Sequence, residues 1–256
     1  MPYIVFLVAV VLPIALWFWF IRWQDRSEPE PGRLMRNCFY AAITAGIGAG
    51  VFELVLFKGL GLPDDLLTIS AISTKATPLA LTTLAVFLVG PIEELAKYIV
   101  LRANVYFSHD FNQVFDGIVY GITIALGFSF VENIFYFLEL YTNQTATIFI
   151  VGTAFRGLFS TLAHVTFTGI VGYFVGKAKF SSGNKTAIIA QGIVYASLLH
   201  ASFDFLVAGP VPYGGLFAAV LMLCCFILFV QLWNRPDVRM IWKFVPSTPP
   251  VPPAQN

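Results

Sequence analysis

Gly90-Pro91-Ile92-Glu93-Glu94-Leu95-Ala96-Lys97 interrupts an otherwise apolar run from Leu79 to Leu101. A charge at the centre of a membrane helix costs roughly 3 kcal/mol, so charged residues in such a run usually face a protein interior and serve a function. Glu93 and Glu94 lie four and three residues before Lys97, so Lys97 can pair with one carboxylate while the other faces elsewhere. A buried structural ion pair is the alternative interpretation.

The Gly90-Pro91 pair predicts a break or kink in this helix. Proline lacks the backbone donor and clashes with the preceding turn, so a helix tends to end or kink there. Glu93 and Glu94 would then lie in the first turn of a new half-helix, where the positive end of the helix dipole stabilises negative charge.

The composition is that of an integral membrane protein. Hydrophobic residues make up 58% of the 256 and charged residues 11%, against about 25% charged residues in soluble domains. The net charge of +1 does not bear on nucleic-acid binding, but the sequence has no basic cluster large enough for it, so nucleic acid is not an expected partner. We expect one membrane domain over residues 1–245 and a disordered Pro-rich tail over 246–256, in a multi-pass protein of the cell membrane.

Long apolar segments predict an all-helical fold with about seven transmembrane helices. The predicted spans are Tyr3–Trp23, Cys38–Phe57, Leu79–Leu101, Asp116–Leu138, Ile148–Gly176, Thr186–Val207 and Gly215–Trp233. Lys and Arg gather after the first, third, fifth and seventh of these. By the positive-inside rule the N-terminus lies outside and the C-terminus in the cytoplasm.

Three further spans carry polar groups that lipid would exclude. Glu132, His164 and His200 each lie on the order of 20 Å from the cytoplasmic end of their predicted helix, at 1.5 Å per residue. Glu93 and Glu94 reach a similar depth if the third span continues past Arg102. Polar groups from four helices at one level predict a single buried site.

The residue types in this set indicate metal chemistry. Two imidazoles and a carboxylate form a common ligand set for catalytic zinc, so His164, His200 and Glu132 are the predicted ligands and zinc the predicted cofactor. Glu93 or Glu94 would take the proton of the zinc-bound water as general base.

Neighbouring polar groups are expected to support that set. Lys97 would hold the second carboxylate of the pair, and Asp204, four residues after His200, would orient its ring through the other nitrogen. Asn133 would also support the ligands.

Some polar residues fall outside the predicted site. Glu53 is interpreted as an interfacial carboxylate beside Lys58, although a functional role is the alternative. Arg156 is expected nearer the outer surface in an interfacial or supporting role, and His109 is a loop residue.

The motifs resemble those of the PrsW family of intramembrane proteases. Glu93-Glu94-Leu95-Ala96-Lys97 is similar to the family's EExxK motif, and Phe115–Gly121 leading to Phe130-Val131-Glu132-Asn133 resembles its second block. His164–Gly169 and His200–Asp204 resemble its histidine blocks. The resemblance covers about residues 90–205 and implies a relationship to CAAX-prenyl and Abi-type membrane proteases.

The resemblance implies a PrsW-like intramembrane metalloprotease that cuts membrane-anchored protein substrates, such as an anti-sigma factor if the source is bacterial. The same superfamily resembles the multi-spanning scaffold subunit of γ-secretase, so fold alone does not establish catalysis. A non-catalytic scaffold or chaperone is therefore one alternative. A proton-coupled transporter is another, although no internal inverted repeat is visible.

Overall fold

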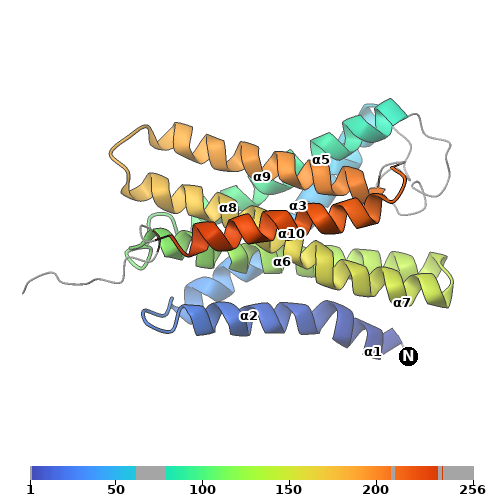
Figure 1. Cartoon of the computed structure of the whole chain (residues 1–256), viewed down its shortest axis with the longest axis horizontal. Helices are drawn as coiled ribbons and strands as arrows, with labels where there is room; N and C mark the ends of the chain where they lie inside the picture. The colour runs from blue at the N-terminus through green and yellow to red at the C-terminus, as the bar shows by residue number, and fades with distance from the viewer. Residues whose placement is uncertain (1, 62–78, 209–210, 236–237, 239–256) are drawn as a thin grey trace, which may run out of the picture.

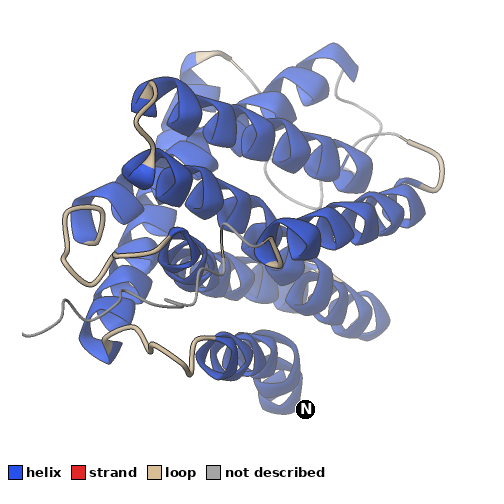
Figure 2. Cartoon of the chain, turned by 60° about the vertical axis from the view of Figure 1, so that its left-hand side comes forward, coloured by secondary structure: helices blue, strands red, loops and turns tan. Residues whose placement is uncertain are grey.

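Every regular element of the described chain is a helix (Figure 1; Figure 2). The computed structural model describes residues 2–61, 79–208, 211–235 and 238. The elements are α1 (Pro2–Phe6), η1 (Leu7–Val11), α2 (Leu12–Gln24), α3 (Gly32–Gly59), α5 (Leu79–Asn104), α6 (Val114–Asn143), α7 (Ala146–Phe155), η3 (Arg156–Ser160), α8 (Thr161–Phe180), α9 (Lys185–Ala208) and α10 (Gly214–Trp233). The all-helical fold class is thereby confirmed.

Six helical stretches are long and apolar enough to cross a membrane. They are Pro2–Gln24, Gly32–Gly59, Val114–Asn143, Ala146–Phe180, Lys185–Val207 and Gly214–Trp233. They coincide with six of the predicted spans, and α5 corresponds to the remaining one. The protein is therefore a multi-pass membrane protein, while the count of seven and the orientation of the termini stay predictions.

Helices α6 and α8 form the centre of the bundle. In the most apolar 18-residue window of α6, 89% of the residues are buried, against 17% for α3 at the periphery. The two central helices approach closely at Gly117 and Gly172, where a Cβ atom on either residue would collide with the backbone of the other helix. Small residues at a crossing permit such contact between membrane helices. In Figure 1, α2 and α9 lie on opposite sides of this centre.

Helix α5 packs against α9 and α3 and brings the charged stretch into the bundle. The predicted break at Gly90-Pro91 is wrong, because α5 runs without interruption from Leu79 to Asn104 with Pro91 inside it. Gly90 serves close packing instead: a Cβ atom there would lie 2.9 Å from both Ala201 N and Ser197 O on α9. The carboxylates are thus in the middle of a helix, without the N-terminal dipole that a half-helix would offer.

The linker between α2 and α3 is anchored by buried acidic groups. Asp25 Oδ2 accepts a hydrogen bond of 2.7 Å from Glu30 N, and the Tyr120 hydroxyl of α6 donates to Glu30 Oε2. Arg22 donates to the Glu30 carbonyl at 2.7 Å. Burial raises the pKa of Asp25 to about 6 and that of Glu30 to about 9. Ordered contacts therefore hold this polar linker against α6.

The predicted disordered tail over 246–256 lies outside the described residues. The predicted fifth span is a continuous helical stretch over 146–180. Its middle is the π-helical turn η3, Arg156–Ser160. Such turns often occur at functional sites because the extra residue turns the side chains that follow.

Candidate active site

Helix geometry places Glu93, Glu94 and Lys97 of α5 within about one turn of each other. Lys97 Nζ donates to Glu93 Oε2 at 3.1 Å and to Glu94 Oε1 at 2.8 Å. Lys97 and Glu94 are fully buried, and the ammonium also lies 4.3 Å from the centroid of the Phe128 ring on α6. Lys97 thus contacts both carboxylates rather than one, because their chain separations of four and three bring both side chains over the same turn.

His164 of α8 has a partner at each ring nitrogen. Lys97 Nζ lies 2.8 Å from Nδ1, and Glu132 Oε2 lies 2.6 Å from Nε2. An ammonium can only donate and a carboxylate oxygen here accepts, so Nδ1 is the acceptor and Nε2 carries the proton. The lone pair of Nδ1 therefore points toward the charged turn of α5, away from Glu132.

His200 of α9 is held in the opposite tautomer. Its Nδ1 lies 3.0 Å from Glu94 Oε1 and donates to it, and Thr168 donates to the other oxygen of Glu94 at 3.0 Å. His200 Nε2 lies 3.7 Å from Glu93 Oε2 and 3.4 Å from Asp204 Oδ2. Asp204 was predicted to bind the other ring nitrogen, but Glu94 occupies that position and Asp204 shares Nε2 with Glu93.

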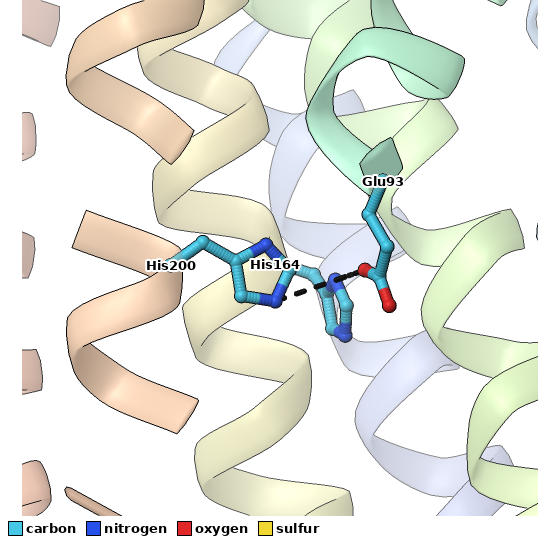
Figure 3. Close-up of side chains that lie close together, drawn as sticks. All are labelled: Glu93, His164 and His200. Carbon is cyan, nitrogen blue, oxygen red and sulfur yellow. Dashed lines mark ion pairs between the residues drawn. The ribbon is translucent and has the colours of Figure 1, made fainter. Parts of the chain in front are cut away.

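Glu93, His164 and His200 converge from three helices on one small space (Figure 3). Glu93 Oε2 lies 3.9 Å from His164 Nδ1 and 3.7 Å from His200 Nε2, and one ligand atom from each residue lies within 4.8 Å of the others. Around a tetrahedral zinc ion with bonds of 2.0–2.1 Å, ligand atoms are about 3.3 Å apart. The three groups thus fit a metal ion after side-chain movements, which include the withdrawal of the Lys97 ammonium from His164 Nδ1.

The charges around His200 favour a cation in that space. With its proton on Nδ1, a neutral His200 would direct the Nε2 lone pair at the carboxylates of Glu93 and Asp204, which is repulsive. A positive group between them, either a second proton or a metal ion, removes this repulsion. The donor set of two imidazoles and a carboxylate is one that zinc prefers.

Glu132 and Arg156 form the outer side of the site. Arg156 donates to Glu132 Oε1 at 2.7 Å, and its guanidinium carbon lies 3.5 Å from the centroid of the Tyr136 ring. The side chains of Glu132 and Arg156 are 22% and 18% exposed, whereas that of His164 is 2% exposed. Arg156 therefore touches the predicted site directly. Glu132, a predicted ligand, binds the Nε2 side of His164 and is not among the three converging groups.

Asn133 lies beside this cluster on α6. Its amide nitrogen donates to Ser129 Oγ at 3.2 Å and to Thr161 Oγ1 at 3.1 Å. Thr161 is one turn before His164 on α8. Asn133 therefore links the two central helices next to the site through these two hydroxyls.

Glu53 is a candidate site residue that the sequence interpretation placed wrongly. It is not interfacial: it is 6% exposed on the buried side of α3 and interacts electrostatically with Glu93, Glu132 and Asp204. Helix α3 continues to Gly59, so Glu53 lies well inside the bundle. In the sequence, Glu53 is four residues from both Ala49 and Phe57. This spacing puts it on the same helix face as these two apolar residues, which are also buried, and so indicates its burial.

Comparison with known proteins shows the family to which this chain belongs. The model of the PrsW family intramembrane metalloproteases matches residues 30–232, a range that contains the predicted core of 90–205. The chain is 33% identical to Protease PrsW of Oceanobacillus iheyensis over 49% of this chain and 54% of that protein. For Protease PrsW of Bacillus subtilis the identity is 35% over 46% and 50%, respectively.

A longer alignment, 29% identical, covers 78% of this chain and 78% of Protease PrsW from Clostridioides difficile. The chain spans about half the length of the first two relatives. No solved structure matches it. The family resemblance predicted from the motifs is confirmed by these matches.

Proposed function

Because this chain belongs to the PrsW family of intramembrane metalloproteases, we propose that it is a peptidase that hydrolyses peptide bonds of membrane-anchored proteins within or beside the bilayer. The observation that carries the proposal is the buried carboxylate of Glu93, whose Oε2 is directed at two imidazoles, 3.9 Å from His164 Nδ1 and 3.7 Å from His200 Nε2. Such a group in a membrane-embedded bundle is costly unless it binds or reacts.

Glu93, His164 and His200 would hold the metal ion, with zinc as the ion best suited to these donors. When bound, zinc acts as a Lewis acid that lowers the pKa of water to near neutrality. Glu132 would then act on His164 from the other side of the ring, fixing its tautomer and orientation instead of binding the ion itself.

The two neighbouring glutamates have different surroundings and would have different roles. Glu94 is fully buried and bound by Lys97, Thr168 and His200, so it positions the ammonium and the second imidazole. Glu93 faces the space between the histidines and is the carboxylate available to a metal ion or to a water proton. We therefore assign the reacting carboxylate to Glu93.

The substrate would be a protein anchored in the same membrane. A membrane-anchored regulator of the anti-sigma type is the substrate class to test first, as the family resemblance suggests for a bacterial source. The partly exposed side of the site, at Glu132, Arg156 and Asp204, is where a substrate backbone and water could reach the histidines.

Cleavage and metal content of four purified full-length variants test this function. Glu93→Gln is expected to abolish cleavage of a co-reconstituted membrane-anchored substrate while the protein stays folded. His164→Ala/His200→Ala is expected to lose both cleavage and bound metal, measured by mass spectrometry of the elements. Glu94→Gln is expected to weaken cleavage less than Glu93→Gln, and the exposed linker variant Glu28→Gln is the control.

The metal measurement also defines the role of Glu93. Loss of metal by Glu93→Gln makes it a ligand, and retention of metal with loss of cleavage makes it the base. Cleavage at the wild-type rate by Glu93→Gln would refute the assignment. If every polar variant in the site unfolds and the wild type cleaves nothing, the cluster is structural and the scaffold alternative is favoured.

A further inference from the structure

Glu53 occupies the single face of α3 that is turned into the bundle. Buried residues of α3 recur at a helical spacing, at Ala42, Ala49, Glu53 and Phe57, whereas Phe52 and Val55 are exposed. Phe57 packs against Ala85, which lies two turns before Glu93 on α5. Glu53 is one turn further from that end of α3, and so faces α5 near the level of the charged stretch.

The electrostatic neighbours of Glu53 are those of the candidate active site. It interacts with Glu93, Glu132, Asp204 and Lys97. Of these, only Lys97 is positive, and Lys97 donates to Glu93, Glu94 and His164. Glu53 therefore faces the site from a fourth side, that of α3, without being one of the three residues grouped as metal ligands.

A hydrogen-bond count distinguishes Glu53 from the other carboxylates of the site. Glu93 and Glu94 accept from Lys97, Glu132 accepts from Arg156, and Asp204 lies against His200. Glu53 Oε1 is buried and has no hydrogen-bond partner within the described part of the chain. A buried acceptor without a donor destabilises the fold. Its presence beside the site points to a donor from outside the described part of the chain, and a bound substrate can supply one.

The substrate backbone is such a donor. A transmembrane helix must be unwound around a bond that is to be cut, and unwinding frees N–H groups that lipid cannot satisfy. Apart from the Phe87 carbonyl, whose helical donor Pro91 lacks, the carbonyls inside α3 and α5 are used within their own helices. A buried side-chain acceptor therefore adds to the few acceptors open to a substrate.

We propose that Glu53 forms a substrate subsite, in which Oε1 accepts a hydrogen bond from a backbone N–H of the unwound substrate segment next to the scissile bond. The proposal rests on the proposed function. In the proposed subsite, Glu53 binds substrate and takes no part in activating water. It follows that removing the carboxylate weakens substrate binding and relieves an unsatisfied buried group at the same time.

Two substitutions separate these effects. Glu53→Leu removes the acceptor, and Glu53→Gln keeps one acceptor oxygen at the same position. The probe is a fluorescent single-span peptide with a Gly-Pro pair at mid-span, in liposomes containing the full-length protein. Glu53→Leu is expected to raise the apparent Kd or KM about tenfold, the size of one lost hydrogen bond, with kcat within about threefold. Glu53→Gln is expected to restore most of the binding.

Two further measurements identify the substrate nitrogen that donates to Glu53 and show how the buried acceptor affects the stability of the protein. N-methylation of one backbone nitrogen near the Gly-Pro pair is expected to weaken binding to the wild type about tenfold, and to add nothing when combined with Glu53→Leu. The thermal unfolding temperature of Glu53→Leu is expected to equal or exceed that of the wild type. Phe52→Leu, at an exposed neighbouring position, is the control and leaves binding and unfolding unchanged.

Wild-type binding by Glu53→Leu, or additive effects of Glu53→Leu and N-methylation at every nitrogen, would overturn the proposal. A lower unfolding temperature without rescue by Glu53→Gln would make Glu53 structural, and absence of peptide binding by the wild type would also contradict the subsite. Failure of the proposed function looks different, because the wild type would then cleave nothing, or Glu93→Gln would cleave at the wild-type rate, whatever residue stands at position 53.

Discussion

Lys97 is the residue that makes the paired carboxylates of α5 tolerable in the membrane. Its ammonium is fully buried and within 3.1 Å of Glu93, 2.8 Å of Glu94 and 2.8 Å of His164. Removing one partner from a buried ion pair leaves a charge without compensation, which costs more than the pair itself contributes. The site therefore depends on Lys97 even if it never touches substrate.

We expect Lys97→Met to lower the free energy of unfolding by about 3–5 kcal/mol, because it leaves both glutamates without their cation. Glu94→Gln/Lys97→Met is expected to recover part of that loss, since one negative charge is removed with the positive one. Thermal or denaturant unfolding in detergent measures both. Lys185→Met, at an exposed position, is the control. A double variant less stable than Lys97→Met alone would contradict the proposed compensation.

At the scale of the helix, the contact between α5 and α9 sets the distance from Glu93 to His200. Gly90 is three residues before Glu93, and its missing Cβ lets α5 approach the backbone of Ser197 and Ala201 on α9. Pro91 removes one hydrogen bond from the turn that precedes it, yet the packing on α9 keeps the helix continuous. Gly90-Pro91 thus allows the close packing of α5 on α9 and does not interrupt α5.

Gly90→Ala is expected to push α5 from α9 and to destabilise the protein by about 1–3 kcal/mol, with loss of cleavage as Glu93 moves from His200. Gly48→Ala is the matched control, because a Cβ atom at Gly48 meets nothing within 4 Å. It is expected to be neutral or slightly stabilising. Unfolding and cleavage assays on both variants measure this, and equal behaviour of the two would argue against a packing role for Gly90.

The α2–α3 linker gives the protein a pH-dependent stability. Burial raises the pKa of Glu30 to about 9 and that of Asp25 to about 6 in the folded protein, from ordinary values of 4.5 and 3.8. As the pH rises through these windows, the unfolded chain loses protons that the folded chain retains. The unfolded state is thereby favoured, and stability falls.

Glu30→Gln, which resembles the protonated acid, is expected to match the wild type near pH 4 and to unfold at a higher temperature than the wild type at pH 8. Asp25→Asn is expected to remove only the part of the decline below about pH 6. Unfolding temperatures in detergent between pH 4 and 9 measure both. A wild-type curve that rises with pH over this range, or a Glu30→Gln difference that is constant with pH, would contradict the assignment.

For the whole molecule, the distribution of basic residues predicts the orientation in the membrane. Reporter fusions after Arg26, Arg102, Lys179 and in the tail are expected to be cytoplasmic. Fusions in the loops after Lys58, Tyr141 and Gly209 are expected to be external, because these loops carry few positive charges. Alkaline phosphatase and fluorescent-protein fusions measure the two sides. An external tail would mean an even number of spans or an inverted protein.

Local features of the sequence were sufficient to predict the membrane helices and the family. Apolar segments of about 20 residues specify a spanning helix because lipid requires every backbone hydrogen bond to be satisfied within the segment. Polar residues inside such segments indicate a buried site because their burial is costly. This pattern predicts the candidate residues Glu93, Glu94, Lys97, Glu132, His164, His200 and Asp204.

The tertiary structure alone decided which side chains meet. Glu93 and Glu94 are neighbours in the chain, yet one faces the histidines and the other is enclosed by Lys97 and Thr168. The rotation of α5 against α8 and α9 sets this difference, and adjacent positions point about 100° apart on a helix. The packing of α8 against α6 likewise gives His164 Nε2 to Glu132, and the packing of α3 against α5 and α6 turns Glu53 inward. Contacts between helices tens of residues apart depend on such packing, which hydropathy and spacing along one helix do not encode.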